Sequence, residues 1–143
     1  SLLVPMNPIL KNILAVLAGI VVGGLVNMAL VQIGIRVVPL PEGVTMEDLG
    51  EGMHLYTPVN FLFPFLAHAL GTLAGAFVAA RVAASHHMKL ALGVGAFFLI
   101  GGIAAVVMFG GPLWFKAADL LLAYIPMGYL GGTLSGKTRS ETV

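Results

Sequence analysis

The feature that most constrains this chain is the near absence of charge from four long apolar stretches. Of its 143 residues, 59% are hydrophobic and only 9% are charged. A soluble domain of this size needs far more charge to cover its surface. Lipid suits such a chain when every backbone group is satisfied within helices. We therefore expect an all-α integral membrane protein.

Four stretches reach the roughly 20 apolar residues that a helix needs to cross the hydrocarbon core. They cover 8–35, 58–80, 90–109 and 112–133. Together they predict a single four-transmembrane-helix bundle over residues 6–134. We expect residues 1–5 to be a remnant ahead of a natural start at Met6, and 135–143 to form a cytoplasmic tail.

The placement of basic residues predicts the orientation of the bundle. Five of the seven Lys and Arg residues fall on one side of the four stretches: Lys11, Arg81, Lys89, Lys137 and Arg139. Because cytoplasmic loops carry an excess of Lys and Arg, both termini are expected in the cytoplasm. The bundle then consists of two hairpins of the same orientation. We expect it in a bacterial inner membrane.

Small residues recur at four-residue spacing along the apolar stretches, which places them on one helix face. The positions expected to carry helix packing are Gly19, Gly23, Gly71, Gly75, Gly101, Gly128 and Gly132. Such faces let two backbones approach closely, within one chain or between chains. A weak internal repeat, in which Lys11 and Gly23-Gly24 recur as Lys89 and Gly101-Gly102, leaves open whether the two halves are duplicates.

Polar residues within apolar stretches are the candidate site, because polar groups in hydrocarbon tend to face a bundle interior. His68 lies near the midplane on the small-residue face. Four other candidates lie from mid-membrane outward, namely Asn27, Asn60, Asp119 and Tyr124, and Thr72 lies in the inner half. This distribution predicts a polar pocket, centred on His68, that opens to the outside.

Each polar residue also has a plain structural explanation. His68 could be a neutral imidazole that only fixes packing, and Asn27 could bond across helices. Asp119 is expected to pair with Lys116 near the headgroups. Pro64 and Pro126 interrupt the second and fourth stretches, and static kinks are expected there.

The long outer loop, 36–57, contains a possible short amphipathic helix over 46–54. Thr45 and Asp48 have the spacing of a capping box. The helix would lie on the membrane surface or cover the pocket, and a solvated acidic connector is an equal alternative. Glu51 and His54, spaced as metal ligands on a helix, could form a metal site with His68, although a single such pair is weak evidence.

Several functions are excluded. Without cysteine, thiol redox chemistry and thiolate metal sites are impossible. There is no phosphate loop, nucleotide fingerprint or Ser-His-Asp set, and no basic aromatic patch for nucleic acid. No cofactor is expected.

The leading hypothesis is a small transport or ligand-binding protein, forming a homo-oligomer, whose acidic outer loop favours cations. The alternative is an accessory subunit that packs against another membrane protein through its Gly and Ala faces. A third, less favoured, is a membrane enzyme with a metal at Glu51, His54 and His68.

Overall fold

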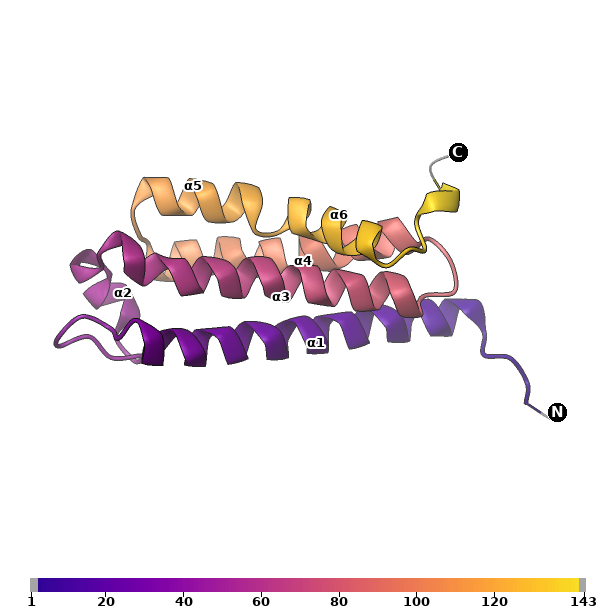
Figure 1. Cartoon of the computed structure of the whole chain (residues 1–143), viewed down its shortest axis with the longest axis horizontal. Coiled ribbons are helices and arrows are strands. Elements are labelled where there is room, and N and C mark those ends of the chain that lie inside the picture. The colour runs from indigo at the N-terminus through magenta and orange to yellow at the C-terminus, as the bar shows by residue number, and fades with distance from the viewer. Residues whose placement is uncertain (1–2, 142–143) are drawn as a thin grey trace.

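The computed structural model describes residues 3–141, and within that range every regular element is helical. The bundle consists of α1 (Pro8–Val37), α3 (Leu62–Val82), α4 (His87–Phe109), α5 (Leu113–Leu122) and α6 (Ile125–Leu134). Short elements are α2 (Leu49–Gly52) and the 3₁₀ turns η1 (Met53–Leu55), η2 (Pro58–Phe61) and η3 (Arg139–Glu141). The helices lie roughly parallel to one long axis, and both chain ends emerge at the same end of the bundle (Figure 1).

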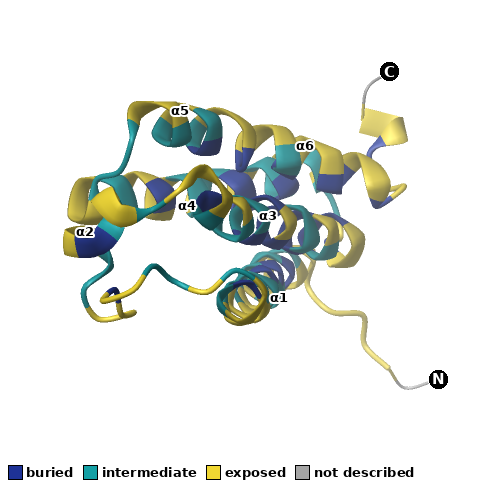
Figure 2. Ribbon diagram, turned by 60° about the vertical axis from the view of Figure 1, so that its left-hand side comes forward, coloured by how far each residue is buried: buried dark blue, intermediate teal, exposed yellow. Residues whose placement is uncertain are grey.

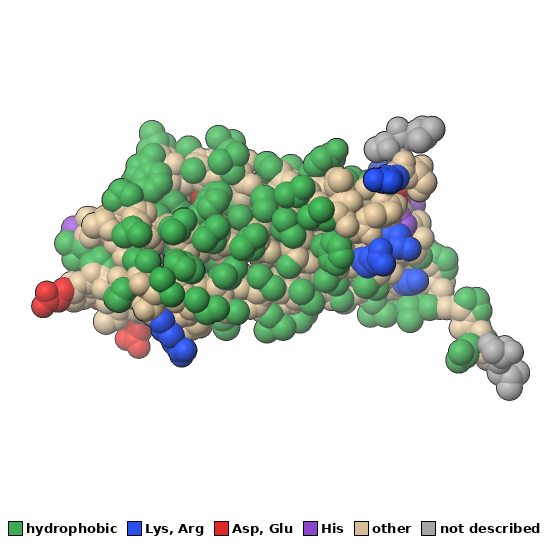
Figure 3. All heavy atoms as spheres, in the orientation of Figure 1, with side chains coloured by type: hydrophobic (Ala, Val, Ile, Leu, Met, Phe, Trp, Pro, Cys, Tyr) green, Lys and Arg blue, Asp and Glu red, His purple; other side chains and the backbone are tan. Residues whose placement is uncertain are grey.

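Three helical segments are long and apolar enough to cross a membrane. Among the described residues they are Pro8–Val37, Pro58–Val82, which includes η2, and His87–Phe109. Hydrophobic side chains cover the middle of the visible face, while blue basic side chains gather at the end that holds the termini (Figure 3). An apolar belt between two polar ends is the surface expected of a membrane protein.

The fourth apolar stretch differs from the single helix predicted over 112–133. It forms two helices of 10 residues each, α5 and α6, that are separated at Ala123 and Tyr124. Pro126 explains the break, because it has no N–H to continue the hydrogen-bond ladder and its ring disfavours helical backbone before it. The prediction of an interruption at Pro126 is therefore confirmed, whereas the prediction of a continuous helix is wrong.

The interruption predicted at Pro64 does not occur. Pro64 lies in the first turn of α3, where a missing N–H breaks no helical hydrogen bond. The helix continues from there to Val82. Helix α3 is the central helix of the bundle. Its buried residues are dark blue in Figure 2, whereas α1 is exposed over most of its surface.

Helices α1 and α3 approach so closely that their backbones touch. A Cβ added to Gly75 would lie 2.5 Å from the carbonyl oxygen of Gly19, and one added to Gly71 would lie 2.8 Å from that of Gly23. Neither position can therefore carry a side chain without separating the helices. Four of the small residues singled out in the sequence thus meet in one interface within the chain.

On α4 the packing within the chain uses Gly102 rather than the predicted Gly101. Gly101 is exposed, and a Cβ added there would have no atom within 4 Å. The neighbouring Gly102 instead faces Tyr124, and Gly95 lies against Tyr124 and Gly128. The four-residue spacing identified the glycines but could not say which of two adjacent ones faces the bundle. Since Gly23 packs while its repeat partner Gly101 does not, the two halves are not packed alike.

Polar contacts tie together the end of the bundle that holds the termini. The Asn12 side-chain oxygen accepts from the backbone N–H groups of Ala84 (2.8 Å) and Ser85 (3.2 Å), which fixes α1 to the turn between α3 and α4. Arg81 donates to the Ser135 carbonyl at 2.9 Å. Glu141 accepts from the backbone N–H of His87 at 2.6 Å, at the start of α4. These contacts hold all four helical segments at this end.

The α1–α3 contact predicts a large difference between two glycines of the same bundle. Gly75→Ala should lower the free energy of unfolding by about 1–3 kcal/mol, the usual cost of overpacking, since its Cβ meets the Gly19 backbone. Gly24→Ala is the matched control on α1, where an added Cβ has no neighbour within 4 Å. The control should be neutral or more stable, since alanine favours helix. Thermal unfolding in a mild detergent measures both, and equal melting temperatures would contradict the contact.

Candidate functional site

The centre of the site is a hydrogen-bonded set of three side chains from α3, α5 and the break before α6. His68 Nδ1 lies 2.7 Å from Asp119 Oδ1. The Tyr124 hydroxyl donates to Asp119 Oδ2 at 3.2 Å, and its ring stacks on the His68 ring with centroids 5.8 Å apart. Asp119 is only 2% exposed, so these two neighbours replace the water that a carboxylate would otherwise require.

The break between α5 and α6 brings the three side chains together. Asp119 lies in the last turn of α5. Its backbone carbonyl oxygen accepts from Ala123 N–H in the hydrogen bond that ends the helix. Tyr124 follows in a non-ideal backbone conformation (φ −114°, ψ −75°) and is 3% exposed. Its hydroxyl reaches inward to Gly102, where a Cβ would lie 2.5 Å away. The helix break is therefore a part of the site.

The hydrogen bonds define the polarity of the His68 ring. An ionised carboxylate only accepts, and with Asp119 in that form Nδ1 carries the hydrogen that points at Asp119. The other nitrogen, Nε2, is then an acceptor when the imidazole is neutral and a donor when it is protonated. A carboxylate behind an imidazole fixes the orientation of the ring.

The pairing of Asp119 with Lys116 predicted from the sequence is wrong. Spacing along one helix made Lys116 the nearest cation in the sequence. Asp119 instead lies on the buried face of α5, directed at α3, and its recorded partners are His68 and Tyr124. A buried carboxylate bonds to the side chains that lie against its own helix face. Spacing along α5 could not identify His68, which lies 51 residues away in the sequence.

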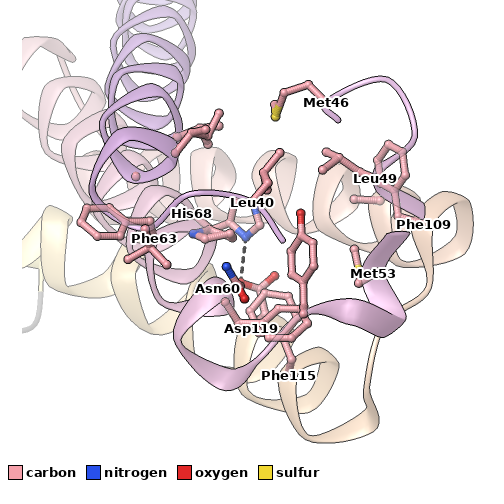
Figure 4. Close-up of a pocket in the computed structure, with 18 of the residues that line it drawn as sticks. Leu40, Met46, Leu49, Met53, Asn60, Phe63, His68, Phe109, Phe115 and Asp119 are labelled. Carbon is pink, nitrogen blue, oxygen red and sulfur yellow. Dashed lines mark hydrogen bonds and ion pairs between the residues drawn. The ribbon is translucent and has the colours of Figure 1, made fainter. Parts of the chain in front are cut away.

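His68 and Asp119 form the floor of a cavity of about 220 Å³. It lies toward the end of the bundle opposite the termini, and we call it the outer cavity (Figure 1). Its walls come from α1, α3, α4 and α5, and its cover is the outer loop. The labelled apolar residues around it are Leu40, Met46, Leu49, Met53, Phe63, Phe109 and Phe115 (Figure 4). The predicted polar pocket is thus an apolar cavity with a polar floor.

The loop that covers this cavity is less helical than predicted over 46–54. Only α2 and η1 form, beginning at Leu49. Asp48 Oδ1 accepts from Thr45 N–H (2.6 Å) and from the Thr45 hydroxyl (2.8 Å). The side-chain bond predicted between Thr45 and Asp48 therefore exists, but it closes a turn that precedes the helix. The two bonds from Thr45 hold the Asp48 pKa below its usual value.

A second, inner cavity of about 220 Å³ lies on the other side of His68. Asn27, Thr72 and Tyr124 line it together with the Phe98 ring. The Thr72 hydroxyl is buried without a hydrogen-bond partner among residues 3–141. His68, Gly102 and Ala105 line both cavities, so the two are adjacent.

Two other predicted groups have different surroundings. Asn60 caps the 3₁₀ turn η2 by accepting from Thr57 N–H at 2.9 Å, and it donates to the Pro39 carbonyl at 3.2 Å. It lines the outer cavity, but its amide is engaged in holding the loop. The His54 ring bonds the backbone carbonyl of Glu51 at 2.8 Å. In the described part of the chain no group of three His, Asp or Glu side chains could hold a metal, so the Glu51, His54 and His68 site is not formed.

The sequence reasoning missed two parts of this site. It named His68, Asp119 and Tyr124 separately, with nothing to show that they bond one another. It also missed Gly102, whose missing side chain makes room for the Tyr124 hydroxyl, although the Gly101-Gly102 pair was noted. Comparison with family models, with curated proteins and with solved structures gives no match to this chain.

The site geometry predicts which partner of Asp119 matters. His68→Ala should lower the free energy of unfolding by about 1–3 kcal/mol, because it leaves the buried Asp119 carboxylate without one of its two hydrogen-bond partners. Lys116→Ala is the control, and it should leave the melting temperature in detergent unchanged. A larger loss for Lys116→Ala than for His68→Ala would instead support the interfacial pair.

Proposed function

We propose that the chain is a small membrane protein that binds a ligand from the outer side and transports it or senses it through His68. One observation carries the proposal: His68 and the buried carboxylate of Asp119 pair at the floor of a largely apolar cavity under the outer loop. Sequestered ionisable groups within a helical bundle are costly, and in membrane proteins they mark proton and substrate pathways. A convergent polar pair within an apolar cavity is also the usual form of a small-molecule site.

The proposed membrane placement has four crossings. α1, α3 and α4 provide three, and the consecutive pair α5 and α6 provides the fourth. Both chain ends lie at one end of the bundle, which an even number of crossings requires (Figure 1). That end carries most of the basic residues, and the opposite end carries the acidic loop, so the termini face the cytoplasm.

Terminal fusions test this placement. A fluorescent protein that matures only in the cytoplasm should be bright when fused after residue 143 and equally bright when fused ahead of residue 1. The same reporter inserted in the outer loop between Glu42 and Gly43 should be dark. A dark C-terminal fusion with a bright N-terminal one would mean that α5 and α6 do not cross, and would remove the four-crossing arrangement.

The cavity favours an amphipathic cation. Its apolar walls, with Phe63, Phe109 and Phe115, suit an aliphatic or aromatic body. At the floor, Asp119 carries negative charge, and neutral His68 offers Nε2 as an acceptor for an ammonium N–H. Glu42, Glu47 and Glu51 in the outer loop add negative charge near the mouth, which raises the local concentration of cations.

Alkylammonium probes test this chemistry in protein reconstituted into lipid nanodiscs. Decylamine should raise the melting temperature of the wild-type protein more than decanol or decyl sulfate of the same chain length. His68→Ala should lose most of that increase, because the acceptor is removed, while His54→Ala on the exposed loop should retain it. An equal effect of all three probes, or an undiminished effect in His68→Ala, would overturn the role assigned to His68.

An accessory role is the second candidate, and one observation favours it. Gly93 and Gly101 lie on α4 with nothing within 4 Å of an added Cβ, so part of this small-residue face is free within the chain. Another helix, from a second copy or a different protein, could pack there. Purification in mild detergent separates the roles: a stoichiometric second membrane protein, lost in a Gly101→Leu variant, would favour the accessory role.

A further inference from the structure

The inner cavity contains polar groups whose hydrogen bonds are incomplete. Thr72 is 1% exposed, and its hydroxyl has no partner within the described part of the chain. The Asn27 side chain has no recorded hydrogen bond in the same range, and the Nε2 atom of His68 is likewise unengaged. Three side chains from α1 and α3 thus present free polar atoms to one cavity.

A dry cavity would be costly for these groups. Leaving the buried Thr72 hydroxyl without a partner carries a desolvation cost that water in the cavity would remove. The cavity volume is about 220 Å³. A single water needs only about 10–15 Å³ of such volume and two to four polar partners. There is room for several waters, and the number of partners is sufficient.

We infer that the inner cavity is a hydrated site, in which water bonds to Thr72, Asn27 and His68. The water reaches it from the outer cavity, since both cavities share the wall formed by His68, Gly102 and Ala105. The site ends toward the cytoplasm where the Gly19 and Gly75 backbones meet. His68 would then contact a polar medium on two sides. This inference does not depend on the ligand proposed above.

Single cysteines test the hydration directly, because the native chain has none to remove. Only the thiolate reacts with a methanethiosulfonate, and thiolate forms in water but not in hydrocarbon. In proteoliposomes, a small membrane-impermeant methanethiosulfonate added outside should label Asn27→Cys and Thr72→Cys. The control for Asn27 is Leu25→Cys on the lipid-facing side of α1, and the control for Thr72 is Ala76→Cys, which is fully buried one turn deeper.

Labelling of Asn27→Cys should be at least about tenfold faster than labelling of Leu25→Cys, as expected from the difference in thiolate population. If Asn27→Cys reacts no faster than Leu25→Cys, the cavity is dry and the inference is wrong. Asn27 is half-buried without side-chain bonds, so this variant should fold even if Thr72→Cys does not.

The route of entry has its own pair of variants. Ala105→Phe places a ring at the wall shared by the cavities and should slow labelling of Asn27→Cys. Ala104→Phe, on the exposed side of α4, should not. Equal rates in both backgrounds would overturn entry through the outer cavity.

A stability measurement gives an independent readout. Thr72→Val keeps the shape and removes the hydroxyl. In a hydrated cavity it should lower the melting temperature, since the water loses a partner. An increase in melting temperature would show that the hydroxyl is buried dry, and would count against the inference.

Discussion

The buried carboxylate of Asp119 is the constraint on which the rest of the outer half depends. A charge in hydrocarbon must be paired and hydrogen-bonded, or it will be neutralised. Here the partners come from two directions, His68 on α3 and Tyr124 beyond the end of α5. The break beside Pro126 places Tyr124 where its hydroxyl reaches both Asp119 and the space left by Gly102. The helix break, Gly102 and the buried carboxylate therefore belong to one arrangement.

The inner half is held by a different kind of interaction. Between α1 and α3, backbone meets backbone at two pairs of glycines. Such contacts gain dispersion energy that lipid cannot match, and they leave no volume for a solute. Polar ties from Asn12, Arg81 and Glu141 reinforce this end. The molecule is therefore open and chemically varied toward the acidic loop, and closed and uniform toward the termini.

The helical class and most helix boundaries could be predicted from the sequence because composition and periodicity are local properties. The charge pattern likewise indicated which ends lie together. The bond from Asp119 to His68 could not be predicted, since no local pattern around residue 119 indicates a contact with residue 68. The face of α4 that packs within the chain could not be predicted, because Gly101 and Gly102 are equally small and only the neighbouring Tyr124 distinguishes them. The apolar character of the outer cavity was missed for a similar reason: methionines in the loop and phenylalanines on α3, α4 and α5 come to line one cavity only after folding.

The closed glycine contact also has an electrical consequence. With the membrane placed as proposed and the inner cavity hydrated as inferred, solvent would reach from outside as far as Thr72. The closely packed layer would then be only the part of the bundle between Gly23 and the end that holds the termini. The transmembrane voltage then falls mainly across that thin layer, where each elementary charge moved is worth about 2.3 kcal/mol per 100 mV. His68 would stand outside most of the field. Binding of a cation at the floor of the outer cavity would then depend little on membrane potential, whereas any step that carries charge past Gly19 and Gly75 would depend on it steeply.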